Sequence, residues 1–372
     1  MVYCLSFLCS ITIGVFLQYG RRELDNNNMK ACIDRSELIC RFGMFFSALP
    51  IFIISAVRYG IGTDYFYTYY PMFVRIAKGD STTHYEIGFL WLNKIIARFT
   101  DDPQWLFVIT SAVFVFASYY AIYKISNNIP EAILLFLLSY TYFVSLNNVR
   151  QSFASAIIFI AVTEYWEEKR IRPIVLVLIA GLFHQSALLF LIVFLVEPVI
   201  LHAESMTVLA IAILGAGRVA KPVVLKIASM IPRLASYFIQ NDLIQYLERS
   251  ISTIMVLVNI AIMLMIAMIE HNNPELYESR DRKWNCVKWI QFICIGLCGL
   301  DGIIPAMYRI IRIFSFMQFL IIPYAISREK NEASRRIYSI LIVAAFCILF
   351  IKLLHDGTEE VIPYRSIFSA IL

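Results

Sequence analysis

Apolar runs that are long enough, or nearly long enough, to cross a bilayer follow one another along almost the whole chain. A helix needs about 20 apolar residues to span the hydrocarbon core, and only helices and closed barrels satisfy their backbone groups there. The pattern predicts an all-α protein, a polytopic transmembrane helical bundle of about 10 to 12 spans. The runs lie near residues 2–19, 40–57, 104–124, 131–146, 152–165, 172–184, 186–201, 205–220, 251–269, 286–304, 313–327 and 337–354.

The composition agrees with this class, because 60% of the residues are hydrophobic and only 16% are charged. No separate soluble domain fits beside the runs, so residues 1–372 are expected to form a single integral-membrane domain. The net charge of +5 does not indicate a nucleic-acid partner, because membrane proteins accumulate Lys and Arg in their inner loops. The eight cysteines show no CxxC or Cys/His spacing, so we expect no metal and no cofactor.

Basic residues sort the loops into two sets. The set with the excess of Lys and Arg is expected to face the cytoplasm, and the other set to face outward. The first run has Arg21-Arg22 after it and no basic residue before it, which predicts a retained helix with its N-terminus outside. The predicted cytoplasmic set includes Arg21, Arg22, Lys30, Arg35, Arg41, Lys124, Lys169, Arg170, Arg172, Arg280, Arg282, Lys283, Arg328, Lys330, Arg335 and Arg336.

The outward set holds arginines that this bias does not explain. Arg75, Arg98, Arg218 and Arg233 are interpreted equally well as snorkelling side chains at helix ends, and residues 233–249 as an amphipathic interfacial stretch. Arg58, Arg150, Arg309 and Arg312 stand in polar, aromatic settings, which favours anion binding.

Proline and polar residues mark several helix starts. The segments Asp102-Pro103, Asn128 before Pro130, and Asn273-Pro274 each place a polar cap before a first-turn proline. Asp101 and Asp102 are therefore interpreted as a cap rather than a metal pair.

Two polar clusters follow the second run. In the first, Gly62 permits close backbone approach to a ligand, while Asp64 with Tyr65 suits a sugar, although tyrosine is also common in the interfacial belt. The second cluster, residues 84–89, begins an amphipathic run that reaches Arg98. Glu86 is there either a helix-start acid or a site carboxylate.

Two more clusters interrupt the apolar middle of the chain. Asn148, Arg150 and Gln151 join two runs with almost no loop, and a central arginine costs roughly 3 kcal/mol in lipid. Arg150 and Gln151 at a helix start can present a guanidinium fork and an amide to a diphosphate; the alternative is a snorkelling arginine at a tight turn. His184 interrupts another apolar run and is either a hydrogen-bonded structural residue or a member of the same site.

In this order, the motifs GxDY from Gly62, YEIGF from Tyr85, NNxRQxxA from Asn147, FHxSA from Phe183, an arginine-containing link before Pro323 and PYxxIF from Pro363 resemble those of the EpsG-like, Wzy-type polysaccharide polymerases. The resemblance is strongest between residues 58 and 191 and weak between residues 202 and 285. The matched positions are Arg58, Gly62, Asp64, Tyr65, Glu86, Asn148, Arg150, Gln151, His184, Arg309 and Tyr364.

The resemblance implies a bacterial inner-membrane glycosyltransferase of the GT-C-like kind. Such an enzyme joins oligosaccharide repeat units carried on undecaprenyl diphosphate into an O-antigen, capsule or exopolysaccharide at the extracytoplasmic face. Its expected partners are the lipid-linked donor and acceptor, membrane lipid and a chain-length regulator protein.

Chemistry assigns expected roles to these residues. Without a metal, fixed cations must stabilise the departing diphosphate, so Arg150 with Arg309 or Arg312 is expected to bind it, with Arg58 assisting. His184 is the first choice for the base, with Glu86 or Asp64 second, and Tyr65 can stack on a sugar. Two alternatives stay open at this point: a flippase of the same lipid-linked sugar, which needs polar residues through both membrane halves, and a membrane O-acyltransferase.

Overall fold

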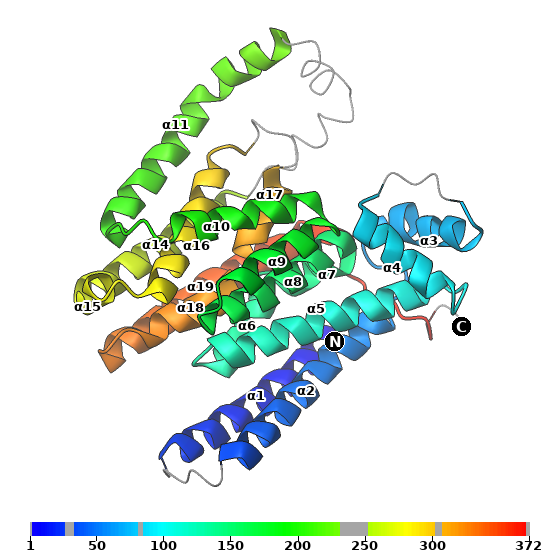
Figure 1. Cartoon of the computed structure of the whole chain (residues 1–372), viewed down its shortest axis with the longest axis horizontal. Helices are drawn as coiled ribbons and strands as arrows, with labels where there is room; N and C mark the ends of the chain where they lie inside the picture. The colour runs from blue at the N-terminus through cyan, green and yellow to red at the C-terminus, as the bar shows by residue number, and fades with distance from the viewer. Residues whose placement is uncertain (1, 27–32, 81–84, 231–251, 302–306, 370–372) are drawn as a thin grey trace. The chain divides into compact units, whose positions relative to one another are not determined.

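The computed structural model describes residues 2–26, 33–80, 85–230, 252–301 and 307–369, and these ranges are predominantly helical (Figure 1). No β-strand occurs within these ranges, and the all-α prediction is confirmed. The chain divides into two compact units, residues 1–188 with 350–372 (unit 1) and residues 189–349 (unit 2). One domain over the whole chain stays a prediction.

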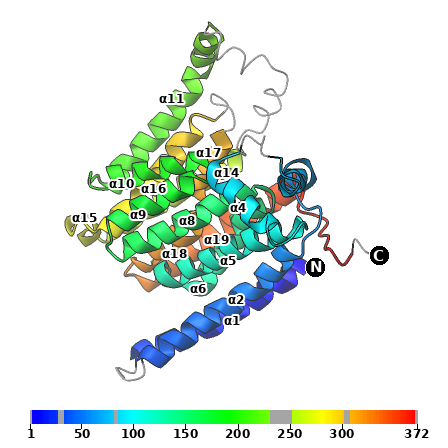
Figure 2. The same cartoon turned by 45° about the vertical axis from the view of Figure 1, so that its right-hand side comes forward.

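Unit 1 is built from helices that pack along their lengths. α1 lies against α2, as both views show, α2 packs on α5, and α5 packs on α8, which contacts α9 (Figures 1 and 2). The helices of this unit are α1 (Val2–Asn26), α2 (Ile33–Ala56), η2 (Tyr65–Tyr69), α3 (Tyr70–Ala77), α4 (Ile87–Ala97), α5 (Gln104–Ile125), α6 (Ile129–Leu138), α7 (Thr141–Asn147), α8 (Val149–Trp166), α9 (Ile171–Gly181) and η4 (Thr358–Glu360).

The helices of unit 1 connect two ends. At one end, which we call the Arg58 end, Gln104 Nε2 donates a hydrogen bond to the carbonyl of Arg58 at 3.1 Å. At the other, the Lys124 end, Lys124 Nζ lies 2.6 Å from Glu167 Oε1, which joins the ends of α5 and α8. α5 has 22 residues, and at about 1.5 Å per residue it separates the two ends by roughly the thickness of a hydrocarbon core.

The two sets of loops distinguished by charge lie at different ends of unit 1. Arg21 Nη1 donates to the Ser126 carbonyl at 3.4 Å, which places Arg21 at the Lys124 end. Arg150 stands in the first turn of α8, whose last residue, Trp166, directly precedes Glu167 of the Lys124 end, and His184 lies 3.3 Å from Glu86, the ion-pair partner of Arg150. The sequence therefore separated the two ends of unit 1 correctly.

Two of the three expected polar caps bond to a helix start, whereas Asn273 does not: α15 has no side-chain cap, and Asn273 Oδ1 has no hydrogen-bond partner among the described residues. The Asn128 side chain accepts a hydrogen bond from the Glu131 amide at the start of α6, and Asp102 Oδ1 accepts one from the Gln104 amide at 2.9 Å. α15 begins at Glu275, directly after Pro274. The interpretation of Asp102 as a cap is confirmed.

The number of long apolar helices is smaller than the twelve runs suggested. Among the described residues, five helices are long and apolar enough to cross a membrane, or six if the bent pair α6 and α7 forms one span. Several other predicted spans fall on shorter apolar helices, because turns and polar residues break those runs before they reach about 18 residues. Shorter apolar helices are Cys40–Ala56, Ile87–Ala97, Ile171–Gly181, Gln185–Val196 and Ala203–Gly217.

Unit 2 has a hydrogen-bonded polar core. Asn259 Oδ1 accepts from Gln318 Nε2 at 2.7 Å and from Gln291 Nε2 at 3.1 Å, which ties α14, α16 and α18 together. Such amide contacts hold apolar helices to one another. Its elements are η3 (Gln185–Phe190, shared with unit 1), α10 (Leu191–Val196), α11 (Ala203–Met230), α14 (Thr253–Asn272), α15 (Glu275–Glu278), α16 (Arg282–Cys298), α17 (Met307–Ser315), α18 (Gln318–Ser327) and α19 (Glu332–His355, ending in unit 1). The amphipathic stretch expected at residues 233–249 lies outside the described residues.

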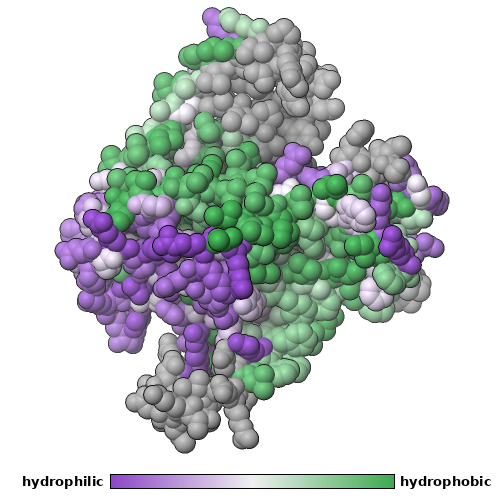
Figure 3. Space-filling model, in the orientation of Figure 1, coloured by the Kyte–Doolittle hydropathy of each residue, from purple (hydrophilic) through white to green (hydrophobic). Residues whose placement is uncertain are grey.

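The surface has the polarity of a membrane protein. Large apolar side chains such as Phe16, Ile171 and Leu195 are 73%, 76% and 76% exposed. Apolar residues cover much of the visible face, while hydrophilic ones gather over α15 and the adjoining end of α18, in a region expected to face the cytoplasm (Figure 3). The chain is therefore a multi-pass membrane protein.

Candidate active site

Three charged or titratable side chains from separate segments meet at the Arg58 end of unit 1. Glu86 precedes α4, Arg150 lies in the first turn of α8, and His184 follows α9. Arg150 Nη1 is 2.5 Å from Glu86 Oε2, and His184 Nδ1 is 3.3 Å from Glu86 Oε1. The Glu86 carboxylate thus bridges the guanidinium and the imidazole, and we call these three residues the Glu86 cluster.

The Glu86 cluster is partly shielded from solvent but still reachable. The side chains of Glu86, Arg150 and His184 are 14%, 21% and 15% exposed. Burial alone would raise the pKa of Glu86, but the adjoining His184 and the positive charge of Arg150 outweigh it and lower this pKa to about 2. Glu86 is therefore a stable carboxylate at neutral pH and a weak base.

Two tyrosines contact Arg150. The ring of Tyr85 lies 4.8 Å from the guanidinium carbon, a cation–π distance, and Tyr69 Oη accepts the Arg150 backbone N–H at 3.4 Å. Arg150 Nε is buried and has no hydrogen-bond partner among the described residues. The guanidinium thus keeps N–H capacity beyond its contact with Glu86.

The backbone of α4 is fixed against the end of α9. The Gly88 amide donates to the Leu182 carbonyl at 2.8 Å, and a Cβ at position 88 would stand only 2.8 Å from that same oxygen. Phe183 packs on Phe153 of α8, with ring centroids 4.6 Å apart. These contacts set the distance between Glu86 and His184, which explains why the YEIGF motif has glycine at its fourth position.

A second polar group adjoins the Glu86 cluster through Asn147 and Asn148. Both asparagines donate to Glu359 Oε2, Asn148 at 3.2 Å. Asn147 Oδ1 also accepts the Asp64 amide at 2.8 Å, and Gly62, with φ +85°, lies against the Asn147 side chain. Asn147 therefore joins the Gly62–Asp64 turn to the C-terminal segment.

Glu359 was missed by sequence reasoning. It lies in a short irregular segment with a positive φ of 64°, without periodicity or a motif around it. The nearest sequence signal is the PYxxIF motif, which begins four residues later and supplied Tyr364 as a candidate. Asp64 and Gln151, which were predicted, lie beside Asn147 and Arg150 in the structure, Asp64 half-buried and Gln151 only 3% exposed.

Arg58 and Tyr65 are placed in the core rather than in an open site. Arg58 is 1% exposed, its Nη1 donates to the Ser55 carbonyl and to Ser111 Oγ, and its guanidinium lies 4.9 Å from the Phe107 ring. Burial lowers the pKa of Arg58. Tyr65, also 1% exposed, stacks on Phe107 at 4.1 Å. Both side chains are enclosed by the protein in this conformation, and their expected contact with substrate stays a prediction.

Tyr364 joins the C-terminal segment to α2. Its hydroxyl donates to the Ile54 carbonyl at 2.9 Å, and Arg58 forms an antiparallel bridge with Ser366. These contacts favour a packing role for Tyr364 in this conformation.

Comparison with known proteins decides the family. The model of the EpsG family matches residues 42–366, a range that includes every candidate residue named above. The chain belongs to the EpsG family. Neither the curated proteins nor the solved structures contain a match.

Membership of the EpsG family points to a polysaccharide polymerase in general, a glycosyltransferase-like enzyme acting on lipid-linked oligosaccharides. Within this EpsG-family chain, Arg309 and Arg312 belong to α17 of unit 2, where their guanidinium carbons lie 5.7 Å and 5.0 Å from the Tyr308 ring. Their convergence with Arg150 on one diphosphate stays a prediction.

The Glu86 cluster offers this EpsG-family enzyme two reactive groups. A carboxylate oxygen of Glu86 lies 3.3 Å from Nδ1 of His184, although the two do not form a hydrogen bond in this conformation, and Nε2 is the other ring nitrogen, which can exchange a proton with a substrate. The guanidinium of Arg150 supplies a fixed positive charge beside it. The arrangement can therefore move a proton and stabilise an anion in one place.

Proposed function

We propose that this chain is a polymerase that joins oligosaccharide repeat units, carried on undecaprenyl diphosphate, into a bacterial surface polysaccharide. The observation that carries the proposal is the Glu86 carboxylate between Arg150 and His184, in a chain of the EpsG family. The enzyme lies in the bacterial inner membrane, and its site faces outward.

In the proposed reaction His184 Nε2 takes the proton from an acceptor hydroxyl as that oxygen attacks the anomeric carbon of the donor. The new glycosidic bond forms as the bond between the anomeric carbon and the diphosphate oxygen breaks. Glu86 stabilises the imidazolium, and the proton leaves for solvent. Glu86, with its pKa lowered to about 2, acts as a positioning residue and not as the base that the sequence left open.

The leaving group is an anion, and Arg150 binds it. The unpartnered Nε–H of Arg150 supports this role, because a diphosphate oxygen would satisfy a buried donor. Arg309 and Arg312 supply further positive charge, while Asp64, Asn148 and Gln151 bind sugar hydroxyls. No step in this scheme needs a metal.

A flippase for the same lipid is the competing function, and it requires an open polar path through both membrane halves. Unit 2 does contain polar residues at depth, but Asn259, Gln291 and Gln318 are 1%, 0% and 3% exposed and bond to one another. They serve as contacts between helices. This packing favours the polymerase.

The proposal is tested in cells by Arg150→Ala and Arg150→Lys, with Arg98→Ala as the control, since Arg98 is an exposed arginine at the end of α4. Surface polysaccharide is separated on a gel after membrane insertion has been checked. We expect the long-chain ladder to collapse to single repeats that accumulate on lipid at the outer face. A normal ladder in both Arg150 variants would contradict the proposal, and repeats trapped at the inner face would identify a flippase.

Sidedness is tested by cysteine labelling in a background without the eight native cysteines. Tyr67 is 87% exposed near the Arg58 end, and Arg172 is 70% exposed at the Lys124 end. Tyr67→Cys should react with an impermeant reagent added to intact cells, and Arg172→Cys only after permeabilisation. The reverse pattern would invert the proposed orientation.

A further inference from the structure

The short helix α4, which begins directly after Glu86, has one apolar and aromatic face that the protein leaves exposed. Ile87, Trp91 and Ile95 follow one another along this face, and Trp91 is 57% exposed. Phe99, two residues beyond the end of α4, is 86% exposed. The opposite face of α4 is buried in unit 1. Large apolar side chains gathered on one exposed face indicate an interaction surface.

This face of α4 adjoins a surface that the protein presents to lipid. The Gly88 amide donates to the Leu182 carbonyl at 2.8 Å, which joins the start of α4 to the end of α9. Leu178 and Leu182 of α9 are exposed, as is Ile87 beside this contact. In a multi-pass membrane protein such exposed leucines face acyl chains. The apolar surface of α9 therefore continues onto α4.

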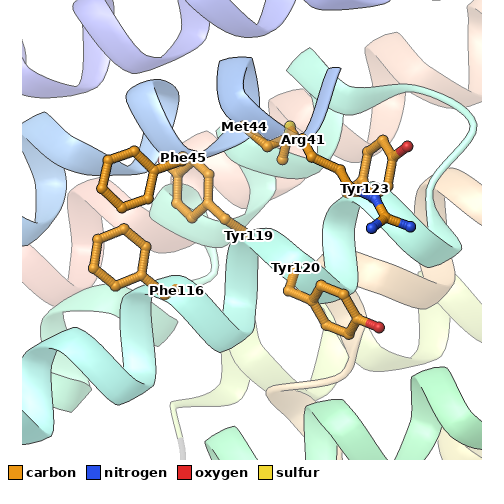
Figure 4. A pocket seen from close by; sticks show the side chains of 7 residues that line it. All are labelled: Arg41, Met44, Phe45, Phe116, Tyr119, Tyr120 and Tyr123. Atoms are coloured by element: carbon orange, nitrogen blue, oxygen red, sulfur yellow. The ribbon is translucent and has the colours of Figure 1, made fainter. Parts of the chain in front are cut away.

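Aromatic residues at the two ends of α5 indicate the level of α4 in the bilayer, because Trp and Tyr gather at membrane surfaces. At the Lys124 end, Tyr120 and Tyr123 line a cavity of about 240 Å³ between α2 and α5 (Figure 4). At the Arg58 end, Trp105 is exposed in the first turn of α5. At about 1.5 Å per residue, Trp105 and Tyr123 stand about 27 Å apart, close to the thickness of a hydrocarbon core. Because α4 packs on α5 and Phe99 shortly precedes Trp105, α4 lies near the membrane surface at the Arg58 end.

The length and charge of α4 agree with this level. Its 11 residues extend over only about 16 Å, too short to cross a bilayer. Lys94 and Arg98 are exposed together with the apolar residues. Two basic residues are costly inside the hydrocarbon core, whereas at the surface their long side chains reach water. A helix with an apolar, aromatic face and basic residues is typical of one that lies in the plane of the membrane surface.

We propose that α4 lies in the membrane surface at the Arg58 end, with Trp91, Ile95 and Phe99 inserted among the lipid head groups and the upper acyl chains. Its partner is the lipid surface. Glu86 precedes α4 directly and contacts Arg150, so the inserted helix holds the Glu86 cluster at the depth of the head groups. The diphosphate of a lipid-linked donor is itself a head group and lies at that depth. This consequence rests on the proposed function, whereas the membrane contact rests on the exposure and polarity of α4.

The depth of α4 is measured with a fluorophore on single cysteines in the full chain, in a background without the eight native cysteines. The protein is placed in phosphatidylcholine nanodiscs whose lipid carries a spin-label quencher near the head group or near the end of the acyl chain. Trp91→Cys carries the probe on α4. Leu8→Cys, exposed within the candidate span of α1, is the control for the hydrocarbon core. Lys78→Cys, exposed after α3, is the control for water.

The order of quenching decides the proposal. The quencher near the head group should act about twofold more strongly on the probe at position 91 than the quencher near the chain end does. The probe at position 8 should show the opposite order, and the probe at position 78 little quenching by either lipid. A probe at position 91 that behaves as either control would overturn the proposal. So would emission typical of an apolar environment without quenching by lipid, because a second copy or another protein would then cover α4.

The consequence for the site is tested with two further variants. Trp91→Glu should draw α4 out of the lipid and shorten the polysaccharide ladder, while Trp91→Phe should keep both, and a thermal melt in detergent checks the folding of each. A normal ladder in Trp91→Glu would overturn the link between the depth of α4 and the Glu86 cluster. A wild type that forms no polymer would contradict the proposed function, while the order of quenching would still decide the membrane contact.

Discussion

Glu86 Oε2 lies 2.5 Å from Arg150 Nη1, although the two residues are 64 positions apart in the chain. One is the last residue before α4 and the other stands in the first turn of α8. The same carboxylate reaches His184, so one acidic residue determines the positions of both groups to which we assign the chemistry.

Removing either member of this pair should affect the other. Glu86→Gln and Arg150→Gln each leave a partly buried partner without its counter-charge, so each should reduce polymer formation and lower the melting temperature. The double variant should lose less free energy of unfolding than the two single variants lose together. The difference, which is the coupling between the two residues, should be about 0.5–3 kcal/mol. The measurement is thermal unfolding of the four proteins in detergent.

The matched control is Glu164→Gln at the Lys124 end, where Glu164 contacts Lys169 at 2.9 Å and Arg172 at 3.5 Å. This change should leave polymer length unaltered. If the stability losses of the Glu86 and Arg150 single variants simply add up in the double variant, the two charges do not stabilise each other.

The ion pair should also give a pH-dependent contribution to stability. The pKa of Glu86 is lowered from 4.5 to about 2, so the folded protein binds fewer protons at this group than the unfolded chain does. The resulting stabilisation is fully present above about pH 4.5 and disappears as the pH falls through about 2. The contribution of the Glu86 carboxyl group to the stability difference between wild type and Glu86→Gln should therefore shrink as the pH falls below about 4.5 towards 2.

Melting temperatures of the two proteins across that pH range provide the check. A difference that grows on acidification would have the wrong sign for a depressed carboxyl pKa.

Gly88 should be intolerant of a side chain. In Gly88→Ala the new methyl group meets the Leu182 carbonyl oxygen at 2.8 Å, so α4 must move away from the end of α9 and carry Glu86 from His184. We expect a stability loss of about 1–3 kcal/mol and a shortened polysaccharide ladder. Gly20→Ala, at a helical position with open space around it, is the control and should keep the normal ladder without loss of stability, because alanine favours a helix more than glycine does. A fully active Gly88→Ala would show that this close approach is not required.

The C-terminal segment should matter to the site through one residue. Glu359→Gln weakens the contacts to Asn147 and Asn148, which hold the Gly62–Asp64 turn and the start of α8. Polymer yield should fall while the protein still inserts and folds. The neighbouring Glu360→Gln alters an exposed acid and should change nothing. Equal effects of the two changes would remove Glu359 from the account.

Sequence patterns located the candidate residues but not their contacts. Glu86, Arg150 and His184 each follow or interrupt an apolar run, which was enough to place them at the same end of the helices. Their pairing depends on how α4, α8 and α9 pack, and contacts between distant segments leave no local pattern in one sequence. The sequence also predicted that Arg150 and Lys124 lie at opposite ends of the helices. This was possible because the excess of Lys and Arg in a loop indicates which side of the membrane that loop faces.

Arg58 and Tyr65 show where local reasoning reached its limit. A polar residue just beyond a helix has the same neighbours in sequence whether its side chain points into a cavity or into the protein. Here the isolated bridge between Arg58 and Ser366 brings the C-terminal segment over this region, and Arg58 is buried against Ser55, Ser111 and Phe107. Hydropathy likewise does not reveal where a helix breaks: among the described residues five or six helices are long and apolar enough to cross a membrane, and the prediction of 10 to 12 spans stays a prediction.

The most direct measurement uses purified protein and a synthetic repeat unit on undecaprenyl diphosphate, with products separated by chain length. The wild type and Glu164→Gln should form dimers and longer chains and release one lipid diphosphate for each linkage made. Arg150→Ala should be slower by about 10²–10³-fold, as expected when a group that stabilises the leaving anion is lost, and His184→Gln should form almost no linkage. Linkage formation by Arg150→Ala and His184→Gln at the wild-type rate would contradict the assignment of both residues.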